Sequence, residues 1–433
     1  MTPEVARASV PVSPRPAGAW WAGFGLGLVV AVVIRVLLLP TDGLRGDLDQ
    51  FILWVHELAT RPFGHAYDEN VSFPPVMLYI WGVLAVVQPA FQTVVDGADP
   101  AIRALMKAPA SLADILLALL VAYELRGRPR WAVAAALGIA LHPALIDISA
   151  WWGQYESIYA LFGLIAYMLA VRGHSLPAAA ILAVAVMTKP QALLFLAPFA
   201  GWFLAKGGWR GAVLAGVVGA AVIALLWAPF LAAGGPAGYA RNLSEYQGDI
   251  FAILSLRAWN AWWLVQEAFA GGSFVSDQTA VVGPLTLRHV GYLLAGVLEV
   301  VVFLAVYRRP TREGLALGLA AAVLVGFTFL TTMHERYAFG ALIFLALLLP
   351  DRRVLAIWLV FGVAFTLNLL AAIPPTPEIA SALPVSGVFG VSGSIAIVAV
   401  TIATLVLLLS RPPPGEPADA ADERDAVPVQ VMG

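Results

Sequence analysis

The chain has 433 residues and a formal net charge of -2; 61% of its residues are hydrophobic, 12% are charged and none is cysteine. Soluble domains are roughly 45–50% apolar and about 25% charged, so this composition excludes an ordinary soluble domain and indicates a membrane protein with many spans. A chain without cysteine forms no disulfides, no cysteine-ligated zinc site and no thiol nucleophile.

Apolar runs repeat to the last predicted helix, and most are near the roughly 20 residues that a helix needs to cross a bilayer. We therefore expect an all-α polytopic bundle of 12 or 13 transmembrane helices. The predicted spans are residues 19–39, 108–124, 131–150, 155–171, 176–188, 191–204, 211–231, 286–306, 314–331, 338–350, 353–373 and 388–409. Residues 74–95 resemble a further span, but counting them breaks the alternation of the loops. Either this segment is re-entrant, or the rule that basic turns are cytoplasmic, which orients the other predicted helices, fails at one turn.

Two polar segments flank the predicted transmembrane domain, residues 19–410. Residues 1–18 are polar and proline-rich, and the first apolar run is long and not followed by a cleavage-site pattern. We expect a retained first helix, not a signal peptide, preceded by a cytoplasmic tail. Residues 411–433 have the composition of a disordered segment and are also expected to be cytoplasmic.

Positive charge orients the predicted helices. Short basic turns lie at residues 126–130, 172–174, 206–210, 307–312 and 351–353, and basic turns of membrane proteins are preferentially cytoplasmic. Alternate counting from these turns brings the other polar segments to the opposite face. Those segments are residues 40–107, 151–156, 188–191, 232–285, 333–337 and 374–378. We therefore expect an extracytoplasmic site built from the first loop, 40–73, the second large loop, 232–285, and the short segments between helices.

The first of these segments concentrates acidic residues. Residues 42–79 contain six acidic side chains, and the apolar spacing after Asp47 predicts an amphipathic helix lying along the membrane interface. Asp49 suits the N-cap of that helix, or a contact with substrate. Asp47 has no such structural task. Beside a low-dielectric surface its carboxylate suits a general base, so Asp47 is the candidate catalytic residue.

Two further segments carry polar groups between apolar runs. Gln154 and Glu156 stand with Asp147 beside two tryptophans, and ionisable groups at membrane depth usually face a cavity or a partner. Interfacial anchoring of the tryptophans is an equal alternative to sugar binding. Lys189 lies on the face where positive charge is not expected. It either extends to the interface or binds an anion.

His334, Glu335 and Arg336 are consecutive at a predicted helix junction. They suit either a self-satisfied cluster or a phosphate site, since arginine offers several fixed donors to phosphate. Together with Lys189, His334 and Arg336 would form a cationic counterpart to the acids of the first loop. An acidic and a cationic subsite are what group transfer from a lipid phosphate requires.

The second large loop contains hydrogen-bonding groups interleaved with aromatic residues, among them Asn260 and Trp262. They are candidates for substrate binding or parts of a short interfacial helix. The sequence has no Walker A, dinucleotide-binding, H-E-x-x-H or EF-hand motif, so a nucleotide-linked donor is not expected. Asp47 and Asp49 could hold a divalent ion, but a hard-cation site needs more oxygen ligands than the sequence places there. We predict no metal site and no cofactor, and the divalent-metal requirement stays open.

Taken in order, these motifs resemble the membrane-embedded glycosyltransferases of the GT-C class. The resemblance is closest to bacterial relatives of the GPI mannosyltransferases and to the lipid-linked glucosyltransferases of N-glycan assembly. It spans residues 46 to about 345 and rests on GDLDQF, FPPVMLY, LIDISAWWGQYES, MTKPQALLFLAP, LSLRAWNAWW and MHERYAFGALIF.

The resemblance implies a sugar donor on a polyprenyl-phosphate carrier, used at the extracytoplasmic face of the cell membrane. It implies that Asp47 is the base and that His334 and Arg336 hold the donor phosphate. Lys189 and Gln191 would line the same cavity. The W-G-Q element of the family leads to an aspartate, whereas Tyr155 and Glu156 follow here. The chain lacks the large C-terminal domain of oligosaccharyltransferases.

We expect an integral membrane transferase that moves one hexose, most simply mannose, to a lipid, glycan or protein hydroxyl, with no nucleic acid partner. Two alternatives stay open. A transporter or flippase of lipid-linked sugars shares the need for a cationic and aromatic cavity, although many transporters show an internal repeat that this sequence lacks. A non-catalytic assembly scaffold is the other.

Overall fold

The computed structural model describes residues 17–246 and 251–410. Helices make up nearly all of its regular structure. The strands are two short pairs: β1 (Ser255–Leu256) runs parallel to β4 (Met333–His334), and β2 (Ala280–Val282) pairs antiparallel with β3 (Leu285–Thr286). The all-α prediction is confirmed. The tails predicted at 1–18 and 411–433 lie, except for residues 17 and 18, outside the described residues.

The first half of the chain forms ten α-helices, a π-helical turn, Asp147–Trp152, and a 3₁₀ segment, η4, Pro190–Phe195. The α-helices are α1 Ala17–Leu38, α2 Arg45–Thr60, α3 Pro75–Val87, α4 Pro100–Glu124, α5 Pro129–Ala140, α6 Pro143–Ile146, α7 Glu156–Val171, α8 Ser175–Val186, α9 Leu196–Trp227 and α10 Gly235–Glu245. Shorter 3₁₀ turns occupy Phe63–His65, Pro89–Gln92 and Ala228–Phe230. Proline stands in the first turn of several of these helices, where its missing N–H costs no hydrogen bond.

The second half forms seven α-helices: α11 Ala261–Ala270, α12 Leu287–Arg308, α13 Arg312–Phe329, α14 Phe339–Ala346, α15 Arg352–Ala372, α16 Pro377–Ala382 and α17 Val388–Ser410. Among these, α13 is apolar on all sides, and its residues from 314 to 328 are buried by the surrounding helices. A helix that is hydrophobic all round belongs in such an interior position.

Seven described helical segments are long and apolar enough to span a membrane, or eight if the pair Pro129–Ala140 and Pro143–Trp152, bent by 42°, forms one span. The chain is therefore a helical integral membrane protein. This number of spanning helices is below the predicted 12 or 13 because some of the apolar runs that were predicted as spans form shorter helices. Helices α3, α7 and α8 have 13, 16 and 12 residues. Within the predicted span 338–350, the α-helix comprises only the eight residues of α14, and all eight are buried.

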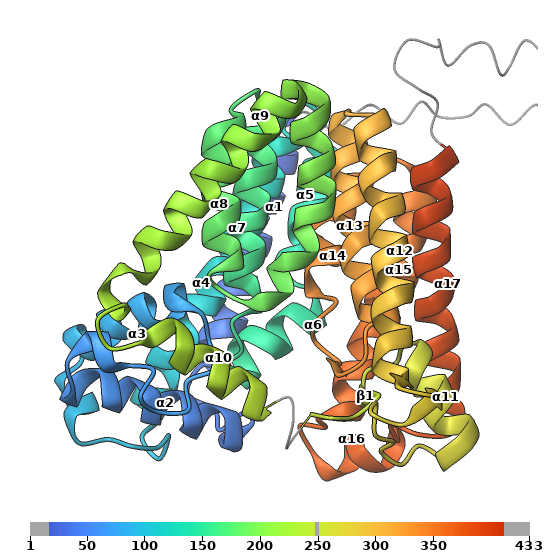
Figure 1. Cartoon of the computed structure of the whole chain (residues 1–433). Helices are drawn as coiled ribbons and strands as arrows, with labels where there is room; N and C mark the ends of the chain where they lie inside the picture. Colours follow the sequence, from blue (N-terminus) through green and yellow to red (C-terminus); the bar gives the residue numbers. More distant parts are fainter. Residues whose placement is uncertain (1–16, 247–250, 411–433) are drawn as a thin grey trace, which may run out of the picture.

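Helix α3 lies against α2 at one end of the bundle and does not run along it (Figure 1). The ambiguous segment 74–95 is thus a short helix followed by a 3₁₀ turn, Pro89–Gln92. Helix α9 contains a break at Gly208, whose φ of 60° and ψ of -170° suit glycine. The break separates the two apolar runs predicted as spans 191–204 and 211–231. Gly201, before it, closely approaches Phe303 of α12.

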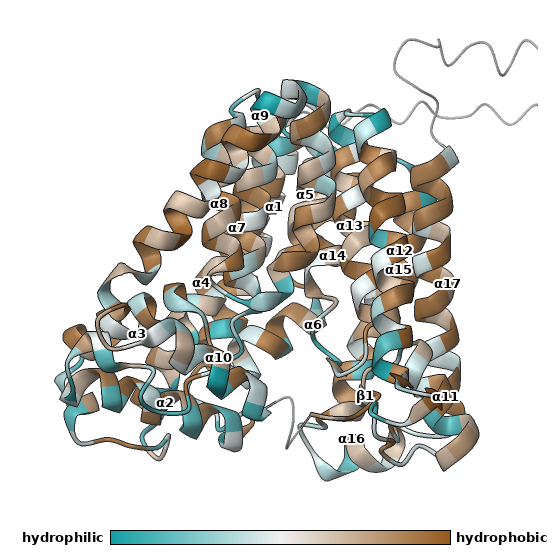
Figure 2. Cartoon of the chain, in the orientation of Figure 1, coloured by the Kyte–Doolittle hydropathy of each residue, from teal (hydrophilic) through white to brown (hydrophobic). Residues whose placement is uncertain are grey.

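The basic turns meet at one end of the molecule, which we call the basic end. Glu124, at the end of α4, pairs with Arg172 (2.5 Å) and Arg312 (2.9 Å). A cavity of about 350 Å³ beside it is bordered by Arg128 and Asp351. The opposite end, formed by α2, α3, α10, α11 and α16, is the loop end (Figure 1). Apolar residues dominate the helices between the two ends, and hydrophilic residues gather at the ends (Figure 2).

A buried ion pair joins the helices that lead to the loop end. Arg35 of α1 donates to the Asp114 carboxylate of α4 (2.9 Å), and the two residues are 2% and 0% exposed. Ser149 of the π-helical turn and Ser157 of α7 both donate hydroxyl hydrogen bonds to Asp114 (2.5 Å each). Arg35 also donates to the Ala140 carbonyl (2.6 Å). The carboxylate thus has partners on three other segments, α1, the π-helical turn and α7, as a charge in a membrane interior requires.

Replacing Asp114 by alanine should destabilise the protein by about 3–5 kcal/mol, because Arg35 is left buried without its counter-charge. Thermal unfolding in detergent measures the loss. The double variant R35L/D114L should recover much of it, since neither charge remains. The control Glu57→Ala removes a partly exposed pair with Arg61 and should change the midpoint little. An unchanged midpoint in Asp114→Ala would contradict this role.

Candidate active site

Asp47 and Asp49 lie on different sides of α2. The helix begins at Arg45 after Leu44, four residues before Asp49, so the predicted N-cap role of Asp49 is wrong. Two residues apart on a helix, side chains diverge. Asp49 accepts a hydrogen bond from the Gly97 N–H (2.8 Å) and pairs with Arg45 (3.1 Å). These contacts fix the loop before α4, and Asp49 does not line the cavity described below.

Asp47 lies in the first turn of α2, where a carboxylate interacts favourably with the helix dipole. Its Oδ2 atom accepts hydrogen bonds from Trp152 Nε1 (3.1 Å) and Gln154 Nε2 (2.6 Å). The other oxygen, Oδ1, accepts none from the described residues. Asp47 therefore has one oxygen that fixes its orientation and one that is free to accept a proton.

The two donors to Asp47 come from an irregular stretch of backbone. The π-helical turn Asp147–Trp152 ends at Gly153, whose φ of 94° is in the left-handed region. This reversal allows Trp152 before it and Gln154 after it to reach the same carboxylate. A side chain at position 153 would also meet Lys107, whose atoms lie 3.0 Å from a Cβ built there. π-helical turns often mark functional sites.

Gln154 connects Asp47 to a buried cation. Lys189 donates to Gln154 Oε1 (3.3 Å) and to Glu156 Oε1 (2.5 Å), and it is 4% exposed. It stands in an extended conformation between α8 and η4, where Pro190 begins the 3₁₀ turn. Burial lowers the pKa of Lys189 to about 8, although Glu156 partly offsets this. Lys189 is thus a cation that can lose its proton just above neutral pH.

Glu156 lies between two cations. Arg336 Nε is 3.2 Å from Glu156 Oε1, the same oxygen that pairs with Lys189, while Oε2 has no hydrogen-bond partner among the described residues. The Arg336 guanidinium lies over the Trp152 ring, 4.6 Å from its centroid. Its Nη1 donates to Glu335 (3.0 Å). The contacts therefore run without a gap from Asp47 through Gln154, Lys189 and Glu156 to Arg336.

His334 ends this chain of contacts. Arg336 Nη1 lies 3.3 Å from His334 Nδ1, so Nδ1 accepts in this contact and the proton of a neutral ring lies on Nε2. Burial, reinforced by Arg336 and opposed by Glu335, lowers the pKa of His334 and disfavours its charged form. His334 lines the same cavity as Lys189 and Arg336, and its assignment to a donor phosphate stays a prediction.

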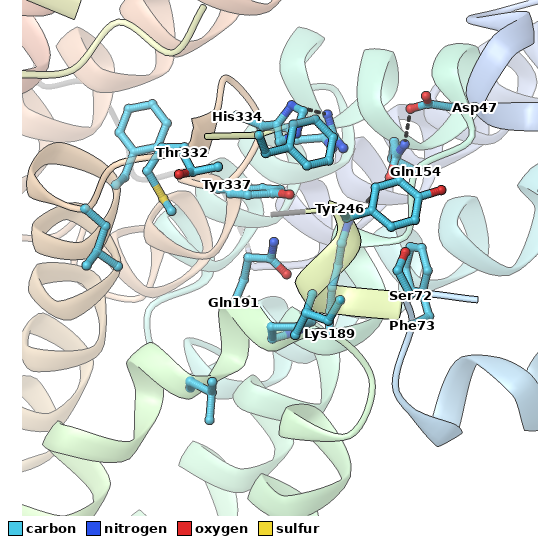
Figure 3. Close-up of a pocket in the computed structure, with 18 of the residues that line it drawn as sticks. Asp47, Ser72, Phe73, Gln154, Lys189, Gln191, Tyr246, Thr332, His334 and Tyr337 are labelled. Carbon is cyan, nitrogen blue, oxygen red and sulfur yellow. Dashed lines mark hydrogen bonds between the residues drawn. The ribbon is translucent and has the colours of Figure 1, made fainter. Parts of the chain in front are cut away.

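These groups border a cavity of about 480 Å³ at the loop end. Figure 3 shows Asp47 and Gln154 on one side of it and His334 and Tyr337 on the other. Its polar lining includes Asp47, Gln154, Lys189, Gln191, His334 and Arg336. Gln191 is notable because its buried Oε1 accepts no hydrogen bond from the described residues. Buried polar atoms are normally paired, so this oxygen is available to accept a hydrogen bond from a ligand in the cavity.

The other part of the lining is apolar and includes Leu193, Leu194, Tyr292, Phe327, Leu330 and Ile373. Tyr292 belongs to α12 and is 53% exposed on the outer surface of the bundle. The cavity therefore joins a polar centre to an apolar side that includes an exposed residue of α12, a helix long and apolar enough to span a membrane. Such a shape suits a ligand with a polar head and a hydrocarbon chain.

Six of the ten predicted site residues line this cavity, and Glu156 lies directly behind Lys189 and Arg336. Asn260 and Trp262 do not line it. Asn260 caps α11 through the Trp263 N–H and donates to the Phe327 carbonyl (both 3.0 Å), and Trp262 donates to the Phe329 carbonyl (2.7 Å). Both fasten α11 to α13, so their alternative interpretation, as parts of a short helix, fits the structure.

Sequence reasoning missed several lining residues, among them Tyr246 and Tyr337, and it left Trp152 open between interfacial anchoring and sugar binding. Tyr337 follows Arg336 directly, and Trp152 lies two residues before Gln154, so adjacency to the predicted residues was an available signal. In residues 17–246 and 251–410, no three histidine, aspartate or glutamate side chains form a group that could hold a metal.

No protein-family model matches this sequence, and no curated protein matches it significantly.

Glu156→Gln should strengthen binding of inorganic phosphate by roughly tenfold, because Lys189 and Arg336 lose a competing carboxylate; tenfold equals about 1.4 kcal/mol. Isothermal titration of the purified protein gives the dissociation constant. Glu57→Gln is the control, since Glu57 pairs with Arg61 and does not line the cavity. Equal or weaker binding to Glu156→Gln would show that Glu156 does not compete for these cations.

Proposed function

We propose that this protein is a glycosyltransferase of the GT-C type that moves one hexose from a polyprenyl-phosphate carrier to an acceptor hydroxyl. The observation that supports it best is the row of contacts from Asp47 to Arg336. It sets a carboxylate with a free oxygen one carboxamide away from the cation Lys189, with a second cation, Arg336, beyond Glu156, and Asp47, Lys189 and Arg336 line one cavity. Group transfer between a hydroxyl and a phosphate ester needs this separation of base and cations.

In the proposed reaction, Asp47 Oδ1 accepts the proton of the acceptor hydroxyl as its oxygen forms a bond to the anomeric carbon. The bond from that carbon to the phosphate oxygen breaks, and its electron pair leaves with the polyprenyl phosphate. Lys189 and Arg336 stabilise the growing negative charge, and His334 Nε2 donates a hydrogen bond. The proton on Asp47 then passes to solvent, which restores the carboxylate.

The lipid part of the donor would occupy the apolar side of the cavity. Leu193, Leu194 and Leu330 offer it hydrocarbon contacts, and the exposed Tyr292 marks the route from the bilayer. The sugar would lie in the polar part of the cavity beside Arg336, whose guanidinium lies over the rings of Trp152 and Tyr337. Gln191 Oε1, buried without a partner among the described residues, would accept a hydroxyl hydrogen bond from it.

Further parts of the proposal follow from charge distribution and the resemblance. The cavity lies at the end opposite the basic turns, which under the positive-inside rule supports our proposal of an extracytoplasmic site in the cell membrane. Mannose is the proposed sugar, and a lipid, glycan or protein hydroxyl the acceptor. A flippase is the rival function; it would form no glycosidic bond, so a transfer assay in detergent with several polyprenyl-phosphate sugars separates the two.

Asp47→Asn should lower the rate of sugar transfer from a synthetic polyprenyl-phosphate mannose by about 10²–10⁴-fold, the usual contribution of a general base. The amide keeps the size of the side chain and can still accept from Gln154, so expression and thermal stability should stay near wild type. Asp49→Asn is the matched control. It lies two residues away on the same helix, bonds Gly97 and does not line the cavity. Full activity of Asp47→Asn would refute the assignment of the base.

The donor kcat/KM should be constant near pH 7 and fall as the pH rises through about 8. The reason is that the pKa of Lys189, lowered by burial, is about 8, and the protonated form that binds phosphate exists below that value. In Lys189→Arg the falling limb should move to higher pH, because arginine stays protonated. Lys206→Arg, at the basic end, is the control. The hypothesis fails if the limb stays unchanged in Lys189→Arg.

A further inference from the structure

A buried carboxylate outside the cavity holds the backbone that carries His334 and Arg336. Asp277 is 0% exposed. It lies in the second large loop, and Arg288 at the start of α12 donates to both of its oxygens (2.6 and 3.0 Å). Oδ2 also accepts from the hydroxyls of Thr331 (2.9 Å) and Thr332 (3.3 Å). One carboxylate therefore connects the loop, α12 and the turn after α13.

That turn contains a residue in an unfavourable conformation. Thr332 has a φ of 64°, in the left-handed region that β-branched residues rarely adopt. Its N–H donates to the carbonyls of Ile253 and Leu254 (3.1 and 3.0 Å). Non-glycine residues keep such a conformation only where the surrounding structure holds them in it. Here the surroundings are the carbonyls of Ile253 and Leu254, which accept from the Thr332 N–H, and the Asp277 carboxylate, which accepts from the Thr332 hydroxyl.

The conformation of Thr332 determines where the next residues point. Met333 and His334 follow as β4, which pairs with β1 in the register Leu256 to His334. Arg336 then reaches Glu156 and Trp152. Without the reversal at Thr332, β4 could not lie beside β1 with His334 and Arg336 facing the cavity.

We propose that Asp277 is a positioning residue. Through Thr331 and Thr332 it holds the turn 331–336 in the one conformation that presents His334 and Arg336 to the phosphate of the donor. The effect of Asp277 on the rate of transfer rests on the proposed function, whereas its effect on the conformation of the turn does not. A purely structural role, in which Asp277 stabilises the protein without acting through Thr332, is the alternative that the experiment has to exclude.

A substitution at Thr332 distinguishes the positioning role of Asp277 from the purely structural role. Glycine adopts a positive φ without steric cost, so Thr332→Gly should keep the shape of the turn when Asp277 is absent. The Thr332 hydroxyl has Asp277 as its described hydrogen-bond partner, so Thr332→Gly removes little else in an Asp277→Ala background. Rescue by this second substitution would arise only if Asp277 acts through the backbone of the turn.

The experiment measures hydrogen–deuterium exchange of the intact protein in detergent, read on peptides that cover residues 329–337. Asp277→Ala should raise exchange there at least about tenfold, and Asp277→Asn should raise it less, since one oxygen still accepts. Asp277→Ala/Thr332→Gly should return exchange toward wild type. Glu124→Ala is the matched control: it loses two ion pairs at the basic end and should leave exchange at 329–337 unchanged.

The same variants are then assayed for transfer from polyprenyl-phosphate mannose. Asp277→Ala should lower kcat/KM by about 10²-fold, the scale expected for a displacement of about 1 Å, and the double variant should recover a large part. Absence of transfer by the wild type would refute the proposed function and leave the exchange result standing. Unchanged exchange at 329–337 in Asp277→Ala, or failure of Thr332→Gly to restore it, would overturn the positioning role. If Asp277→Ala does not fold, Asp277→Asn with and without Thr332→Gly makes the same comparison.

Discussion

The Asp114 carboxylate is the constraint on which the rest of this bundle depends. A charge in the interior of a membrane protein must be paired and fully hydrogen-bonded, and Asp114 meets that condition with partners from α1, the π-helical turn and α7. Because none of these segments can move without leaving the charge unpaired, they are fixed relative to α4. Neither Arg35 nor Asp114 lines the cavity of the candidate site.

Its importance for the site comes from where its partners lie in the sequence. Ser149 and Ser157 stand on either side of the segment that contains Trp152, Gln154 and Glu156. Held at both ends, this segment can contain irregular backbone, with a left-handed Gly153, and still direct its side chains reproducibly. Asp277 fulfils the same requirement for the turn before His334. Each wall of the cavity thus has its own buried carboxylate, outside the cavity, that fixes it.

The sequence predicted the assembly of this site better than its details. Alternation of basic and polar loops is a property of the whole chain, so it correctly brought Asp47, Lys189 and Arg336 to one end. The roles of individual residues within their own segments were harder to predict from the sequence. The N-cap prediction for Asp49 was wrong because the helix begins four residues earlier, at Arg45, whose side chain bonds the Gly97 carbonyl far along the chain.

Other features depended on pairings that a single sequence does not reveal. Arg35 and Asp114 are 79 positions apart, and Asp277 and Thr331 are 54 apart. Each looks unremarkable in its own segment. The span count was too high for a related reason: apolar length alone does not tell a spanning helix from a short, enclosed one such as α14. Burial by neighbours, which decides between them, is a tertiary property.

The charges around the cavity also bear on the direction of the proposed reaction. Two cations, Lys189 and Arg336, face three carboxylates, Asp47, Glu156 and Glu335. The free site therefore has no surplus of positive charge with which to bind a highly charged donor, and a phosphodiester with a single negative charge suits it best. During transfer Asp47 would gain a proton while the departing phosphate gains a negative charge. Negative charge would thus move from Asp47, whose partners are the neutral Trp152 and Gln154, toward the two cations. In a buried site this displacement would be favourable, and it would require that Asp47 and Lys189 be joined, as they are, by the neutral Gln154 carboxamide and not by a direct ion pair.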